Sequence, residues 1–160
     1  MTRHLAQLNI GRTVADLDHP QLSGFMDNLD RLNALAERMP GFVWRMTGEG
    51  NNATDIKLEG DPRFISNLSV WETPQALATY VWGTVHRQFY ERKGEWFEAM
   101  DEAHFVMWWV PVGHRPSVEE GTARLAHLRQ YGPSDHAFGW ESLRLSGRAL
   151  PQTCSTLAAE

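Results

Sequence analysis

His86 is the residue whose type and position best suit acid–base chemistry in this chain of 160 residues. Apolar side chains recur at helical spacing from Leu77 to Phe89, and His86 falls at the edge of that stripe, next to Trp82. A histidine at such a border can be partly desolvated and titrate near neutral pH, which suits an acid, a base or an axial ligand to haem iron. The alternative is a histidine that only hydrogen-bonds a neighbour. We take His86 as the first catalytic candidate.

Asn33 is the second catalytic candidate, because it falls within an apolar stripe formed by Leu29, Leu32 and Ala36. That position predicts a buried amide, and a buried amide needs hydrogen-bond partners. The partner is either backbone, which makes the role structural, or the carbonyl of a ligand or a bound dioxygen species.

Two strand patterns carry polar side chains where apolar ones are usual. Asn67 and Ser69 share a side with Trp71, and Gln7 shares a side with Asn9 in the first strand. If both rows face helices, they line a polar and aromatic cavity, with Asn67 as a catalytic and Asn9 as a substrate-binding residue. If they face a partner sheet, they form interface hydrogen bonds. The sequence does not choose between the two faces.

Aromatic residues and one arginine complete the set of substrate-binding candidates. Trp71, Trp82, Trp109 and Phe89 can wall a site for an aromatic molecule, although aromatic side chains in strands are more often core or interface. Arg45 can anchor an acidic or phenolate group, against the commoner outcome of a surface salt bridge.

Composition excludes several classes of partner. The net charge of -5, with 42% hydrophobic and 22% charged residues, indicates a globular domain without the basic field that nucleic acids or anionic membranes attract. No apolar run reaches the roughly 20 residues of a membrane span, and no signal-peptide core follows the N-terminus. The lone Cys154 cannot form an intrachain disulfide, which suits a reducing compartment. We therefore expect a cytoplasmic protein that binds neither nucleic acid nor membrane.

Several chemistries lack their motifs. The sequence has no phosphate-binding glycine loop, no dinucleotide fingerprint, no nucleophile elbow and no His-Glu-x-x-His pair. With one cysteine, zinc cannot be held by thiolates. We predict no metal site, except that His86 would be the iron ligand if haem is bound, and we favour no cofactor.

The elements that must position these residues follow from periodicity and from turn residues. The expected order is strand His4–Ile10, helix Gln21–Met39, strand Phe42–Thr47, strand Phe64–Trp71, helix Thr73–Arg92, strand His104–Val110, a helix capped by Ser117, and strand Ala137–Leu145. Residues 1–145 are predicted to form a single domain, and residues 146–160 a flexible tail.

The first six elements repeat a strand-helix-strand plan, with Phe42 aligning to Phe105 at an offset of 63 residues. Such a duplication predicts a ferredoxin-like α+β fold, with an antiparallel sheet and helices on one face. The opposite face would carry aromatic residues and need a cover. We therefore expect a homodimer that pairs sheet against sheet, a dimeric α/β barrel.

Motifs along the chain from His4 to about Leu145 resemble those of the domain of unknown function 3291 family (DUF3291). They are Asp30-Arg31-Leu32-Asn33-Ala34-Leu35-Ala36 running into Pro40-Gly41-Phe42-Val43-Trp44-Arg45, then Asn52-Ala53-Thr54-Asp55-Ile56, Ser69-Val70-Trp71-Glu72, Trp108-Trp109-Val110-Pro111-Val112-Gly113-His114-Arg115-Pro116, Arg124-Leu125 and Gly132-Pro133. The resemblance implies membership of the dimeric α/β-barrel proteins. That group also contains antibiotic-biosynthesis monooxygenases, haem-degrading monooxygenases, chlorite dismutases and stress-responsive barrel proteins.

The leading functional hypothesis is a small dimeric enzyme that acts on an aromatic or polycyclic small molecule. The resemblance implies a monooxygenase-like oxidation without flavin or nicotinamide, in which His86 takes or holds a proton and Asn33 or Asn67 orients oxygen or a carbonyl. One alternative is a haem-binding protein, peroxidase-like or haem-degrading, with His86 on the iron. Another is a non-catalytic module that binds an apolar ligand or a protein.

Overall fold

A four-stranded antiparallel sheet forms the centre of the protein. The computed structural model describes residues 2–48 and 61–145. The strands are β1 (Arg3–Arg12), β2 (Phe42–Arg45), β3 (Phe64–Trp71) and β4 (Phe105–Pro111). They lie in the order β2-β3-β1-β4, and every neighbouring pair is antiparallel. Two interlocked β-α-β units give this order, so the predicted ferredoxin-like α+β fold is confirmed.

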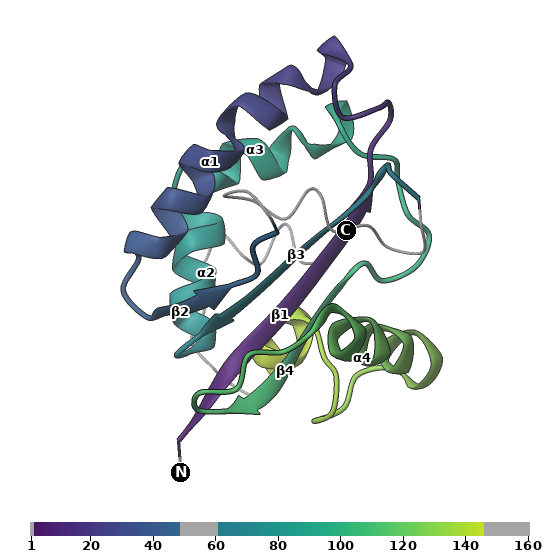
Figure 1. Ribbon diagram of the computed structural model, residues 1–160. Coiled ribbons are helices and arrows are strands. Elements are labelled where there is room, and N and C mark those ends of the chain that lie inside the picture. Colours follow the sequence, from purple (N-terminus) through teal and green to yellow (C-terminus); the bar gives the residue numbers. More distant parts are fainter. Residues whose placement is uncertain (1, 49–60, 146–160) are drawn as a thin grey trace.

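The helices of the two β-α-β units lie on one side of the sheet (Figure 1). They are α1 (Ser23–Arg38), preceded by the 3-10 helix η1 (Pro20–Leu22), and α2 (Pro74–Gly83). Both pack with Leu5 and Trp71 of the sheet in one buried cluster. We call the side of the sheet that carries Leu5 and Trp71 the inner face.

The outer face carries the alternate residues of the same strands, including Leu8 and Trp108. Helix α4 (Val118–Tyr131) lies on this side (Figure 1) and buries Leu125 there. Gly121 permits the close approach, because a Cβ atom at this position would lie 3.0 Å from Cδ2 of Leu8. The expectation that helices cover one face only is therefore wrong for α4, although it holds for α1 and α2. As predicted, Ser117 caps α4, since its Oγ accepts a hydrogen bond from the backbone N–H of Glu120.

The second long helix breaks near its middle. A single helix over Thr73–Arg92 is expected from periodicity, but α2 ends at Gly83 and α3 spans His86–Glu91, followed by the 3-10 helix η2 (Lys93–Glu95). Thr84 takes an extended conformation (φ -125°, ψ -175°), which no helix can continue through. Its hydroxyl donates to the Tyr80 carbonyl at 2.6 Å and accepts from the His86 N–H at 3.2 Å. The break therefore sets His86 at the start of a new helix.

The end of the described chain is helical, so the predicted strand over Ala137–Leu145 is wrong. Phe138 alone pairs with β4, exchanging two backbone hydrogen bonds with Met107 at 2.7 and 3.0 Å. The short helix α5 (Trp140–Leu145) follows, and Trp140 stacks on Phe105 at 5.6 Å between ring centroids. The predicted tail 146–160, with Cys154, lies outside the described residues.

Candidate functional site

A hydrogen-bonded polar network lies on the inner face at the centre of the sheet. Gln7 Nε2 donates to Asn67 Oδ1 and to Ser69 Oγ, each at 2.7 Å, and Trp71 Nε1 donates to Ser69 Oγ at 2.9 Å. The register of β1 and β3 places Gln7 opposite Ser69, so the contacts follow directly from strand pairing. The sequence left open which face of the sheet carries these polar rows. In the structure they lie on the inner face, which α1 and α2 cover.

The network is buried at one end and accessible at the other. Ser69 is 6% exposed and Trp71 1% exposed. Asn9 and Asn67 pair with each other in register, one step further along the strands, and both are exposed. Because β1 and β3 both lie inside the sheet and the helices cover this face, exposure here means that the helices do not close over the asparagine pair. A small molecule can therefore reach the inner face at this point.

Three rings stacked in series border the network. Trp71 stacks on Tyr80 at 5.5 Å between centroids, and Tyr80 contacts the imidazole of His86 at 4.8 Å. The Tyr80 hydroxyl donates to the Leu32 carbonyl of α1 at 2.9 Å. Burial raises the pKa of Tyr80 well above its usual value, while the charge of Arg45 lowers it in part, so the side chain stays a phenol. Tyr80 is buried because α1 covers this side of α2.

His86 is held as a neutral imidazole of defined orientation. Its Nδ1 lies 3.2 Å from the Val81 carbonyl oxygen. A carbonyl can only accept, so Nδ1 carries the proton and Nε2 keeps a free lone pair. Burial lowers the pKa of His86 to about 4, and the hydrogen bond to Val81 opposes that shift only in part. The expectation that His86 titrates near neutral pH is therefore wrong, and the ring is an acceptor at pH 7.

Arg45 and Asn33 are the two remaining polar candidates, and Arg45 lies beside this site. Arg45 pairs with Ser69 in strand register, its side chain is 8% exposed, and its Nε donates to Glu37 Oε1 at 2.7 Å. Arg45 thus forms a salt bridge in which the arginine side chain is largely buried and the Glu37 side chain is 47% exposed. Asn33 is buried on α1 as predicted, and its side chain forms no hydrogen bond with the described residues.

Of the remaining aromatic candidates, Trp82 and Phe89 pack in other groups, whereas Trp109 packs at the edge of the cluster that holds Trp71. Trp82 packs with Ala78, Tyr90 and Trp140, Phe89 stacks on Trp96, and Trp109 lies between Phe138 and the guanidinium of Arg3. The ring contacts of Trp82 and Phe89 are thus with other aromatic side chains, whereas the imidazole of His86 contacts Tyr80. We call the group formed by Gln7, Asn9, Asn67, Ser69, Trp71, Tyr80 and His86 the inner site.

Sequence reasoning placed Ser69 and Gln7 in the two polar rows but did not name them as catalytic or binding residues, and it missed Tyr80. The signal for the first two was present, since polar residues alternating in two central strands are unusual. Tyr80 gave no signal, because only the position of α1 decides which sides of α2 are covered.

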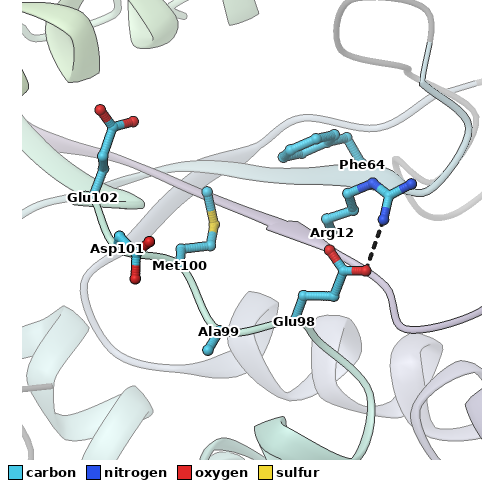
Figure 2. A pocket seen from close by; sticks show the side chains of 7 residues that line it. All are labelled: Arg12, Phe64, Glu98, Ala99, Met100, Asp101 and Glu102. Atoms are coloured by element: carbon cyan, nitrogen blue, oxygen red, sulfur yellow. Dashed lines mark hydrogen bonds and ion pairs between the residues drawn. The ribbon is translucent and has the colours of Figure 1, made fainter.

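A separate hollow of about 470 Å³ opens beside the end of β1 (Figure 2). It is lined by Arg12, Phe64, Glu98, Ala99, Met100, Asp101 and Glu102. Arg12 donates to Glu98 at 2.7 Å and to Asp61 at 3.0 Å, so its charge is satisfied within the protein. These exposed pairs are typical of loop anchoring, and we regard the inner site as the better candidate.

The described residues offer little for a metal ion. No group of three or more His, Cys, Asp or Glu side chains that could hold one occurs within residues 2–48 and 61–145. A single axial ligand to haem iron is compatible with His86, because metal-ligating histidines donate their second ring N–H to a carbonyl or carboxylate, as Nδ1 does here.

Fold and site together define the class: a ferredoxin-like α+β domain with an accessible polar and aromatic site between sheet and helices. The chain belongs to the family described as domain of unknown function (DUF3291), whose model matches residues 4–152. This confirms the resemblance seen in the motifs.

Among solved structures, the chain is similar to a candidate antibiotic biosynthesis monooxygenase from Chloroflexus aurantiacus J-10-fl. The identity is 20%, the match covers 71% of this chain and 97% of that one, and the TM-score is 0.42. A similarity this distant carries no function. No curated protein matches the chain. No helix within the described ranges is long and apolar enough to cross a membrane.

Proposed function

We propose that the protein is an enzyme that binds a planar aromatic molecule at the inner site and oxidises it in a monooxygenase-like reaction without flavin or nicotinamide. The observation that carries this proposal is the inner site itself. Polar groups that can orient a ligand lie beside the Trp71 ring, on a face where Asn9 and Asn67 are exposed.

The proposed chemistry draws its electrons from the substrate. A CH2 group activated by a phenol or ketone and one O2 give a C=O group and water, so no external reductant is consumed. The protein's part is to exclude water, to orient the substrate and to stabilise its anion. Arg45 supplies a largely buried positive charge on this face. The amide of Asn33, which has no hydrogen-bond partner among residues 2–48 and 61–145, is available to a carbonyl or to dioxygen.

His86 takes a different role from that of a strong general base. A group with a pKa of about 4 does not hold a proton at neutral pH. Its free Nε2 can still accept a hydrogen bond from a substrate hydroxyl and receive its proton transiently as the anion forms. We therefore propose that His86 orients and polarises an acidic substrate.

Oxygen consumption tests the proposal. Purified protein is screened with polycyclic phenols and anthrone-type ketones, and products are examined for the replacement of two hydrogens by one oxygen. His86→Ala should reduce turnover at least tenfold, in line with the usual contribution of a proton-transfer group. His4→Ala is the matched control, because His4 shares β1 with the inner site but lies on the outer face. If the protein binds these compounds but does not oxidise them, it is a ligand-binding module and not an enzyme.

Haem binding is the second candidate, favoured by the hydrogen bond that fixes His86 with Nε2 free. The visible spectrum of the protein with one equivalent of haemin should then show a Soret band that His86→Ala loses. A spectrum identical to that of haemin in buffer would exclude this candidate.

We also propose that the protein forms a homodimer through the outer face. Trp44, Met46 and Phe64 lie at the margin of the outer-face core and are only partly buried. Large apolar side chains left in this state favour a partner surface. Sedimentation velocity should show a dimer that Trp44→Glu dissociates, and a wild-type monomer at micromolar concentration would refute this.

A further inference from the structure

The hydroxyl of Ser69 has both of its acceptor positions filled. The Trp71 Nε1–H donates to it at 2.9 Å and the Gln7 Nε2–H at 2.7 Å. An indole N–H can only donate, so Ser69 must be the acceptor in that pair. A hydroxyl oxygen has two lone pairs, and its one remaining capacity is to donate its own hydrogen.

That hydrogen has no acceptor among the described residues. Ser69 accepts hydrogen bonds but donates none to the residues in 2–48 and 61–145. The residue is 6% exposed, so bulk water does not solvate it freely. A buried donor without a partner is unfavourable, and its usual explanation is a missing ligand or water.

The same network turns a second donor towards the accessible end of the site. Asn67 Oδ1 accepts from Gln7 Nε2 at 2.7 Å, which leaves the Asn67 amide N–H groups directed away from the network. Asn67 is exposed, so these hydrogens can meet a ligand. The inner face thus presents the Ser69 hydroxyl and the Asn67 amide as neighbouring donors on one strand.

We infer that the inner site recognises its ligand through an acceptor oxygen, a ketone, quinone or phenolate oxygen on the aromatic ring system, which receives hydrogen bonds from Ser69 and Asn67. This inference rests on the proposed function, since it names the substrate class of the same site. Trp71 and Gln7 act as positioning residues, because their N–H groups fill the Ser69 lone pairs and so force its hydrogen towards the ligand.

A matched ligand pair tests the inference. Equilibrium dialysis compares 9-fluorenone with fluorene, which have the same planar rings and differ in one carbonyl oxygen. Wild-type protein should bind fluorenone more tightly. Ser69→Ala should weaken fluorenone binding roughly 2- to 10-fold, the effect of one hydrogen bond, and leave fluorene binding unchanged. Ser69→Thr keeps the hydroxyl and should restore the preference.

Further variants distinguish the loss of a residue that positions the Ser69 hydroxyl from a general disruption of the site. Trp71→Phe should reduce the fluorenone preference although Phe carries no group that touches the ketone oxygen. Asn67→Leu changes an exposed residue and should reduce the preference without affecting folding. Ser66→Ala is the control, because Ser66 is equally buried on the same strand but on the outer face, and it should change neither affinity.

The outcomes distinguish this inference from the proposed function. Equal binding of fluorenone and fluorene by wild-type protein, or equal weakening of both by Ser69→Ala, would overturn the acceptor-oxygen inference and leave an aromatic site standing. Failure of wild-type protein to bind either compound would overturn both.

Discussion

Two buried tryptophans, Trp71 on the inner face and Trp108 on the outer face, satisfy their indole N–H groups in opposite ways. Trp108 Nε1 donates to Glu120 Oε1 at 3.0 Å, and the second oxygen of that carboxylate contacts His114 Nε2 at 2.7 Å. Both oxygens of the Glu120 carboxylate in this outer network therefore have a partner. Trp71 instead donates to Ser69, which is left with a hydrogen to give.

The difference separates a network that stabilises the fold from one suited to binding. Burial raises the pKa of Glu120, but hydrogen bonds from His114 and Trp108 outweigh it, so the carboxylate is held ionised with its pKa below the usual value. This links the turn after β4 to α4, which explains the His114 motif as a structural one. The inner network is neutral, and among the described residues the Ser69 hydroxyl hydrogen has no acceptor.

Removing Trp108 should have the largest effect on stability. The side chain is fully buried, so Trp108→Ala should lower the free energy of unfolding by about 3–5 kcal/mol. Urea denaturation measures this change. Val112→Ala, at a position 52% exposed, is the control and should change stability by less than about 0.5 kcal/mol. If Trp108→Ala lowered the free energy of unfolding by less than about 1 kcal/mol, the interpretation that the outer network stabilises the fold would be wrong.

Acid should destabilise the protein through His86. Its pKa is lowered from 6.5 to about 4, so between these values the folded state binds fewer protons than the unfolded chain. The free energy of unfolding therefore falls as pH falls from 6.5 to 4, by about 3 kcal/mol in total. His86→Gln, which cannot titrate, should lack this part of the pH dependence in denaturation curves.

The outer network responds in a separate pH range, which makes the test specific. The pKa of Glu120 is lowered from 4.5, so its contribution is present above that value and is lost as pH falls below it. Glu120→Gln should remove only the loss below pH 4.5 and leave the decline above it unchanged. If Glu120→Gln also removed the decline between pH 6.5 and 4.5, that decline would not belong to His86.

Replacing the two buried serines of β3 should give the smallest changes in stability, and these changes compare the two faces of the sheet directly. Ser66, on the outer face, has a buried hydroxyl with no partner among the described residues, so Ser66→Ala should be neutral or stabilising by about 1 kcal/mol. Ser69→Ala removes the acceptor of Trp71 and Gln7 and should destabilise by about 1–3 kcal/mol. Thermal denaturation of both variants measures these changes. If Ser66→Ala were less stable than Ser69→Ala, the proposed difference between the outer and inner networks would be wrong.

Sequence patterns predicted the elements whose signals are local. β3 was placed correctly at both ends, and Ser117 was recognised as a cap because a hydroxyl before a helix has a local partner. The helix break at Thr84 was not predicted, because the apolar residues keep their helical spacing through it. The helical α5 was taken for a strand, because a short run containing Trp140 and Leu143 suits either structure.

The candidate site was predicted in its residue types but not in its grouping. Asn67, Asn9, Trp71 and His86 were named, and the structure brings them to one face. Trp82 and Phe89 were named by the same reasoning and pack in other groups, whereas Trp109 packs at the edge of the cluster that holds Trp71. Aromatic character alone cannot tell these groups apart, because the assignment depends on which helix covers which ring.

The sequence alone determined the order of the elements, the duplication and the polar rows of β1 and β3, because alternation and helical periodicity are properties of neighbouring residues. Tertiary structure decided which way those rows face, since α1 and α2 pack on one side and α4 on the other. It also decided that His86 meets Tyr80 and that Ser69 accepts two hydrogen bonds. These contacts join residues far apart in the chain, and only packing of the whole domain fixes them.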